Sequence, residues 1–165
     1  LQGGDYANCL MVATVAAIIS YIPIGSIAAK LGRKKTILIG IILLGSCFFA
    51  ASLFNTYSNI MPVFFCIIGF AWAAIGVNSY PMVVEMASAG DVGKYTGLYY
   101  TFSMTAQVIT PILSGWLLEN VGYRTLFPYS VIFCVLAFIT MSQVKHGDSR
   151  PEKKANTLDN LDIDD

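Results

Sequence analysis

Uncharged segments far longer than those of an ordinary domain alternate with short charged ones along this chain. Residues 6–29, 36–84, 95–118 and 125–144 contain no Asp, Glu, Lys or Arg. A helix needs about 20 apolar residues to cross a bilayer core. The run 36–84 is long enough for two crossings, and its polar cluster NTYSN at 55–59 predicts a turn between them. We therefore predict five helical spans, at about 7–29, 36–54, 60–84, 95–118 and 125–144.

Composition agrees with an all-α membrane protein. Hydrophobic residues make up 56% of the 165 positions and charged residues 12%, whereas soluble domains carry about 25% charged residues. We predict a partial transmembrane domain over 1–146, with the lipid bilayer as its main partner. Residues 147–165 are charged and poor in aromatics, which predicts a disordered cytoplasmic tail.

Basic residues fall almost entirely on one side of the predicted spans. Of the ten Lys and Arg residues, only Arg124 lies in a loop on the other side. Because Lys and Arg accumulate in cytoplasmic loops, we place the 30–35 loop, the loop with Lys94 and the C-terminus in the cytoplasm. The N-terminus is then predicted to lie outside, with the chain in the plasma membrane.

A polar stripe runs along the fourth predicted span. Its members recur three or four positions apart, which places them on one helical face: Thr96, Tyr100, Ser103, Gln107, Thr110 and Ser114. Ser and Thr can bond to their own helix backbone, so contact with another helix would also explain the stripe. Gln107 and Tyr100 form such hydrogen bonds to their own helix less readily, which favours a water-filled or substrate-filled cavity around them. Pro111 also removes a backbone hydrogen bond near mid-membrane.

The third predicted span carries further candidates for helix contact and for a cavity. Small residues that would allow another helix to approach lie on one face: Gly69, Ala73 and Gly76. Trp72 is a cavity candidate, and Asn78 forms either an interhelical hydrogen bond or part of a cavity, since an unpaired amide in an apolar span costs free energy. Pro81 predicts a kink or an end of the helix, and Pro23 a bend in the first span.

The loop between the first two spans, GSIAAKLGRKKTILIG at 25–40, is the most specific local pattern. It resembles the motif of the major facilitator superfamily, which combines glycine, an acidic position, a basic residue and Gly-Arg-Lys or Gly-Arg-Arg. The matching residues are Gly25, Lys30, Gly32, Arg33, Lys34 and Lys35. Ala29 stands at the acidic position, so this copy lacks the carboxylate of the motif.

The basic residues of this loop need partners, and Glu85 is placed to supply one. Glu85 ends the third span on the predicted cytoplasmic side, within reach of Arg33 or Lys34. We predict a pair that forms and breaks as the cytoplasmic side opens. A simple topology anchor, attracted to lipid headgroups, is the alternative.

Residues 78–129 resemble the second half of glycoside-pentoside-hexuronide symporters and proton-coupled sucrose carriers. The residues that match their segment before the penultimate helix are Asp91, Gly93, Lys94, Tyr95, Thr96 and Gly97. The resemblance implies that the spans are helices eight to twelve of a partial major facilitator fold, with the missing N-terminal helices upstream. It also implies alternating access and a small-molecule substrate, a sugar or glycoside, moved with a cation or proton. Trp72 or Tyr99 could then stack on a sugar ring.

Other functions stay open at this stage. A drug or metabolite transporter and a helix bundle without transport activity are both compatible with the pattern. A channel would more often show rings of charge or a repeated filter. We predict no enzyme, metal, cofactor or nucleic-acid partner, because the cysteines are scattered in apolar spans and His146, the one histidine, lies in the tail.

Overall fold

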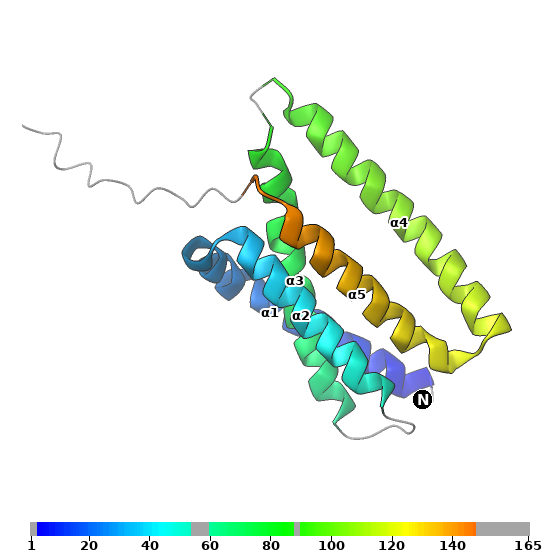
Figure 1. The fold of residues 1–165 in the computed structure, drawn as a ribbon. Coiled ribbons are helices and arrows are strands. Elements are labelled where there is room, and N and C mark those ends of the chain that lie inside the picture. The colour runs from blue at the N-terminus through cyan, green and yellow to red at the C-terminus, as the bar shows by residue number, and fades with distance from the viewer. Residues whose placement is uncertain (1–2, 54–59, 88–89, 148–165) are drawn as a thin grey trace, which may run out of the picture.

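The computed structural model describes residues 3–53, 60–87 and 90–147, and in this part the chain is entirely helical. It has five α-helices and one short 3-10 helix, and no strand (Figure 1). In order these are α1 (Gly3–Leu31), α2 (Arg33–Ser52), α3 (Met61–Glu85), α4 (Val92–Asn120), η1 (Tyr123–Thr125) and α5 (Leu126–Gln143). The all-α prediction is confirmed, and each predicted span coincides with one helix. The predicted turn at 55–59 lies outside the described residues, as does all of the predicted tail except Gly147.

Four of the described helices are long and apolar enough to cross a membrane: Ala7–Leu31, Arg33–Ser52, Met61–Glu85 and Leu126–Gln143. The remaining long helix, α4, has 29 residues and carries the polar stripe. Its length exceeds what a membrane crossing requires, but it is not among the four helices that are both long and apolar enough. That α4 crosses the membrane therefore stays a prediction.

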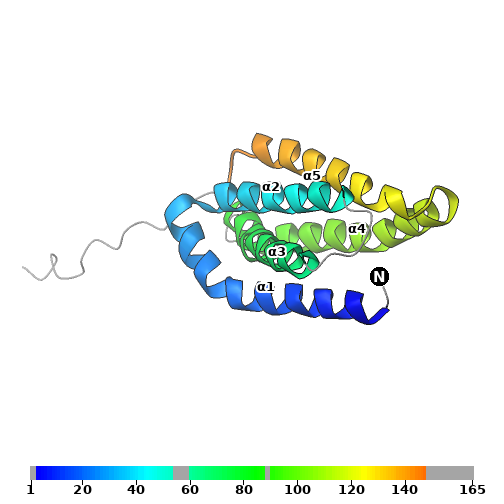
Figure 2. The same cartoon turned by 90° about the horizontal axis from the view of Figure 1, so that it is seen from below.

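The third helix, α3, is the centre of the packing, with α1 on one side and α2 on the other (Figure 2). Ala17 and Ile24 of α1 form a buried cluster with Ala73 and Ala74 of α3. The predicted small-residue face therefore takes part in helix contact through Gly69 and Ala73. Gly76, in contrast, has no neighbouring atom within 4 Å of the position of a Cβ, and it faces away from this contact.

The second helix also packs on its other side, against α5. Ile37 and Ile41 of α2 and Met82 of α3 form a second buried cluster, which Met141 and Val144 cover from the end of α5. The bundle is thus layered in the order α1, α3, α2 and α5, and α4 contributes no buried residue to it.

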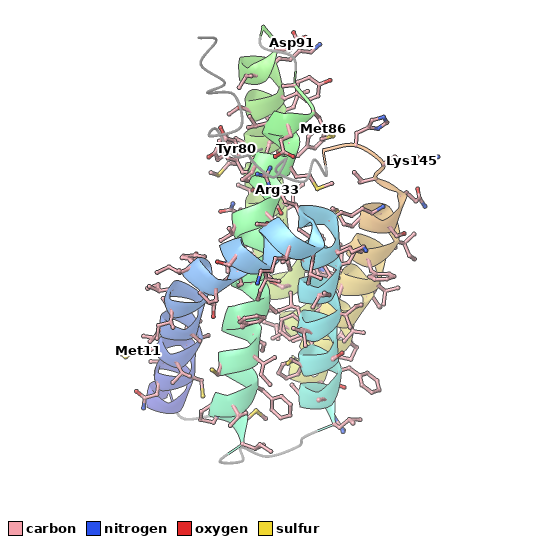
Figure 3. The ribbon with its side chains drawn as sticks, turned by 90° about the vertical axis from the view of Figure 1, so that its left-hand side faces the viewer. Met11, Arg33, Tyr80, Met86, Asp91 and Lys145 are labelled. Carbon is pink, nitrogen blue, oxygen red and sulfur yellow. The ribbon has the colours of Figure 1, made fainter. Side chains whose placement is uncertain are left out.

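Glycine and proline shape the helices at three places. The predicted loop at 30–35 is reduced to a reversal at Gly32, whose φ of 95° lies in the region that favours glycine. The first helix contains Pro23 and bends in its C-terminal half (Figure 3). The third helix contains Pro81 and ends at Glu85, one residue beyond the predicted span of 60–84.

A hydrogen-bonded lysine joins the start of α2 to the end of α5. The Lys34 Nζ donates to the carbonyl oxygens of Ser142 at 2.8 Å and Val144 at 2.6 Å. The last carbonyls of a helix have no partner within the helix and carry partial negative charge, so a cation is favourable there. We call this region, where α1, α3 and α5 end and α2 begins, the basic end of the bundle; Arg33 and Lys145 lie there in Figure 3.

We expect Gly69→Ala to destabilise the protein and Gly76→Ala not to do so. A Cβ at residue 69 would overlap the backbone carbonyl of Ala13 in α1, and overpacking of this kind costs about 1–3 kcal/mol. Both changes gain the same helix propensity, about 1 kcal/mol. Thermal unfolding of the two purified variants in detergent measures the difference, and equal midpoints would contradict the packing described here.

We expect Lys34→Met to loosen the contact between α2 and α5. The variant loses two hydrogen bonds from a charged donor, one exposed and one half-buried, so each is worth less than a bond protected from water, which contributes about 1.5–3 kcal/mol. Lys35→Met is the matched control, because Lys35 is the exposed neighbour. Limited proteolysis after residue 144 should be faster in Lys34→Met than in Lys35→Met, and the same rate in both would count against the capping role.

Candidate functional site

A cavity of about 640 Å³ lies between α3 and α4. The third helix contributes Trp72, Ile75, Gly76 and Ser79. The fourth contributes Tyr99, Ser103, Ala106, Gln107, Thr110 and Pro111. Three members of the predicted stripe therefore share one cavity wall, and the volume is within the range of small-molecule sites.

The stripe residues that line the cavity keep hydrogen-bonding capacity. In the described part of the chain, the Gln107 side chain makes one such bond, from Nε2 to the Ser103 Oγ at 3.4 Å, and the Thr110 hydroxyl makes none. Thr105, which lies off the stripe, donates to its own helix at the carbonyl of Thr101. Ser114, beyond the cavity, also bonds locally to Pro111. Gln107 and Thr110 thus present unused donors and acceptors to the cavity.

Two predicted cavity residues lie elsewhere. Tyr100 forms an aromatic cluster with Tyr80 and Tyr99, at ring-centroid distances of 5.9 and 5.4 Å, and it does not line the cavity. Asn78 is 2% exposed and donates from Nδ2 to the carbonyl of Ala74 at 2.8 Å. It lies two positions beyond Gly76, about 200° around the helix, and thus on the other side of α3. Its hydrogen bond is within its own helix rather than between helices.

Two aromatic side chains flank the cavity from opposite helices. Trp72 is 63% exposed and also borders a second, apolar cavity of about 400 Å³ among α1, α2 and α3. Tyr99 faces it from α4. Ser79, which the sequence interpretation did not select, follows Trp72 by seven positions, or two helical turns, and this spacing could have identified it.

An ion pair at the basic end joins α2 to α3. The Arg33 guanidinium is hydrogen-bonded to the Glu85 carboxylate. Their side chains are 30% and 24% exposed, so solvent weakens the attraction. Of the two predicted partners of Glu85, Arg33 makes the contact, whereas Lys34 binds the end of α5.

The remaining motif residues lie around this ion pair and at the start of α4. Gly25 borders a cavity of about 200 Å³ together with Arg33 and Asn78, while Lys30 is exposed in the last turn of α1. Asp91 precedes α4, and its carbonyl accepts a hydrogen bond from the Tyr95 N–H at 3.1 Å. Lys94 is exposed in the first turn. The segment that suggested a symporter thus forms a helix start.

The described residues bring no cluster of candidate metal ligands together. Within residues 3–53, 60–87 and 90–147, no group of three or more His, Cys, Asp or Glu side chains could hold a metal ion. The polar groups on the residues that line the α3–α4 cavity are hydroxyls, one amide and the indole N–H of Trp72, which suit hydrogen bonding to an uncharged molecule.

Comparisons with known proteins agree with the helical architecture. The chain is 29% identical over 160 residues to an uncharacterized MFS-type transporter of Schizosaccharomyces pombe, covering 94% of this chain and 34% of that protein. It is 22% identical over 120 residues to the chloramphenicol resistance protein CraA of Acinetobacter baumannii, covering 73% of this chain and 29% of that protein. No significant match to a solved structure was found.

The chain spans about a third of the length of these curated relatives. A family model described as the Major Facilitator Superfamily matches residues 3–160, which is nearly the whole chain. The four apolar helices and the basic reversal at Gly32 fit this match. The chain is an integral membrane protein and belongs to the Major Facilitator Superfamily.

Proposed function

We propose that this chain is part of a secondary transporter that moves a small uncharged solute by alternating access, and that the α3–α4 cavity forms part of its substrate site. The observation that carries the proposal is the unused hydrogen-bonding capacity of Gln107 and Thr110 in a cavity bordered by Trp72 and Tyr99. In the proposal, α1 to α5 correspond to helices eight to twelve, and preceding helices supply the opposite wall. The basic end is cytoplasmic, because Lys and Arg gather there.

A sugar or glycoside is the substrate class that the cavity favours. The residues that line it carry no formal charge, so a charged solute would gain no counter-charge from them. Hydroxyl and amide groups supply directional hydrogen bonds, which discriminate strongly for matching polar groups. Trp72 and Tyr99 offer flat apolar faces on which a sugar ring can stack.

A drug-like solute is the second candidate. One relative is a chloramphenicol resistance protein, and the apolar cavity of about 400 Å³ that shares Trp72 gives an aromatic molecule a hydrophobic surface. Such a solute would depend on Trp72 more than on Gln107, because its binding energy would come mainly from apolar contact.

Coupling to a cation or proton would need a titratable group at membrane depth. The described residues that line the α3–α4 cavity include no Asp, Glu, Lys, Arg or His. The proposal therefore places any coupling group in helices outside this chain. It assigns the five helices to solute recognition and to the cytoplasmic gate.

The proposed gate is the ion pair between Arg33 and Glu85. It joins the first residue of α2 to the last residue of α3 at the basic end. Opening of that end would separate the two helix ends, so the pair would form and break once in each transport cycle. Because both side chains are partly exposed, water can solvate the separated charges, which keeps the cost of breaking small.

Replacing Gln107 by alanine should raise KM for a transported sugar while kcat stays within a factor of about two. The loss of a neutral hydrogen bond costs about 0.5–1.5 kcal/mol, a factor of about 2–12. The measurement is uptake by cells that express the complete transporter, with a panel of labelled sugars and with chloramphenicol.

Val108→Ala is the matched control for this experiment, because Val108 is the exposed next residue and does not line the cavity. Tyr100→Phe should also leave KM unchanged. An unaltered KM for every sugar in Gln107→Ala would contradict the sugar proposal. Loss of chloramphenicol transport in Trp72→Ala but not in Gln107→Ala would favour the drug-like solute.

Exchanging the charges of the ion pair tests the gate. Arg33→Glu and Glu85→Arg should each lower kcat, because two like charges would then face each other, and the double variant should recover part of the rate. Lys30→Glu makes a similar charge reversal on an exposed residue of the neighbouring turn and serves as control. If the double variant is as slow as the slower single variant, the pair does not gate transport.

A further inference from the structure

A third cavity, the one that Gly25 and Arg33 line, lies beside the ion pair and has no role in the proposed function. It measures about 200 Å³, and small residues of α1, among them Ala28 and Ala29, form one wall. Arg33 borders it from α2 and Asn78 from α3. Ala29 is the residue at the acidic position of the loop motif, so a methyl group stands where a carboxylate would occupy part of the space.

Asn78 directs an unused acceptor into this cavity. Its Nδ2 donates to the carbonyl of Ala74, so Oδ1 points away from that turn, and no described residue donates to it. Among the described residues, every side-chain nitrogen or oxygen that is fully shielded from solvent has a hydrogen-bond partner. The Oδ1 of this 2% exposed residue must therefore border open space, and the cavity is the space that Asn78 lines.

The backbone supplies a second acceptor. Pro81 lies inside α3 and has no N–H, so the carbonyl of Val77, four residues earlier, lacks its usual helical partner. Val77 and Pro81 both line the cavity. The Asn78 Oδ1 and the Val77 carbonyl are thus two acceptors open to a further donor, at a cavity that Arg33 also lines.

This combination of groups selects the chemistry of the occupant. A cation would be repelled by the Arg33 guanidinium, and an anion would meet carbonyl oxygens and the Glu85 carboxylate that pairs with Arg33. A neutral molecule that both donates and accepts hydrogen bonds satisfies every group. One water needs a space of about 10–15 Å³ and two to four polar partners, and the cavity provides both.

We propose that this cavity is a structural water site that joins Asn78 to Arg33. Water accepts a hydrogen bond from the guanidinium and donates to the Asn78 Oδ1 and the Val77 carbonyl. Asn78 is thereby a positioning residue, which holds the guanidinium through water on the side away from Glu85. The consequence for transport rests on the proposed gate, whereas the water site itself does not.

Radiolytic hydroxyl labelling with mass spectrometry tests the site directly, since bound water is the source of the label. In the purified complete transporter in lipid nanodiscs, Val77 and Pro81 should be labelled well above the fully buried Ile24. Ala29→Leu, which fills the cavity from α1, and Asn78→Leu, which removes the acceptor, should each reduce that labelling several-fold. Gly76→Ala, on the same helix with no neighbour nearby, should not.

Labelling of Val77 and Pro81 no higher than that of Ile24 in the unaltered protein would overturn the water site. Unchanged labelling in both cavity variants would overturn it as well. The exposed Met86 reports whether each variant is folded and receives the same dose. Because labelling requires no transport, it gives a result whether or not the proposed solute and gate are right.

The positioning role has its own readout in the complete transporter. Asn78→Leu should lower kcat several-fold and leave KM unchanged, because Asn78 does not line the α3–α4 cavity. Asn78→Asp keeps an oxygen acceptor at the cavity that Arg33 also lines and should retain most of the rate. If Asn78→Asp is as slow as Asn78→Leu, or if Asn78→Leu alters KM alone, Asn78 does not act through Arg33.

Discussion

The reversal of the chain at Gly32 is the constraint on which the basic end depends. Because one residue with positive φ separates α1 from α2, Arg33 and Lys34 emerge in the first turn of α2, beside the ends of α3 and α5. Cations at a helix N-terminus oppose the helix dipole. Arg33 and Lys34 have compensating partners, the Glu85 carboxylate for Arg33 and the last carbonyls of α5 for Lys34, whereas Lys35 is exposed to solvent.

The fourth helix is held by a different kind of contact. It has no buried residue among those described, and it meets α3 through the tyrosine cluster of Tyr80, Tyr99 and Tyr100. Polar groups on its α3-facing side would be costly in a tight apolar interface. A helix with such a face is better suited to line a cavity than to fill a core, and this is the arrangement between α3 and α4.

Most of the fold could be predicted from the sequence because charge-free runs of membrane length leave little choice. The shared face of Ser103, Gln107 and Thr110 followed from spacing alone, as helical periodicity fixes which side chains lie together. The positions of Tyr100 and Asn78 could not be predicted in the same way. They depend on where α4 crosses α3 and on which side α1 packs, and these are properties of helix pairs that no single helix encodes.

The third helix connects the α3–α4 cavity to the basic end, because it borders a different cavity on each of its two faces. Trp72, Gly76 and Ser79 border the larger cavity, whereas Asn78 and Pro81 border the small one beside Arg33. In the proposed transport cycle, a shift of this part of α3 around a solute would move the groups on both of its faces. Pro81 lies between the larger cavity and Glu85, at the one place near that end where the backbone hydrogen bonding of α3 is interrupted. In the proposed cycle, a small change of angle there would alter the distance between Glu85 and Arg33 without disturbing the packing of Gly69 against α1, so α3 would stay anchored at one end and move at the other.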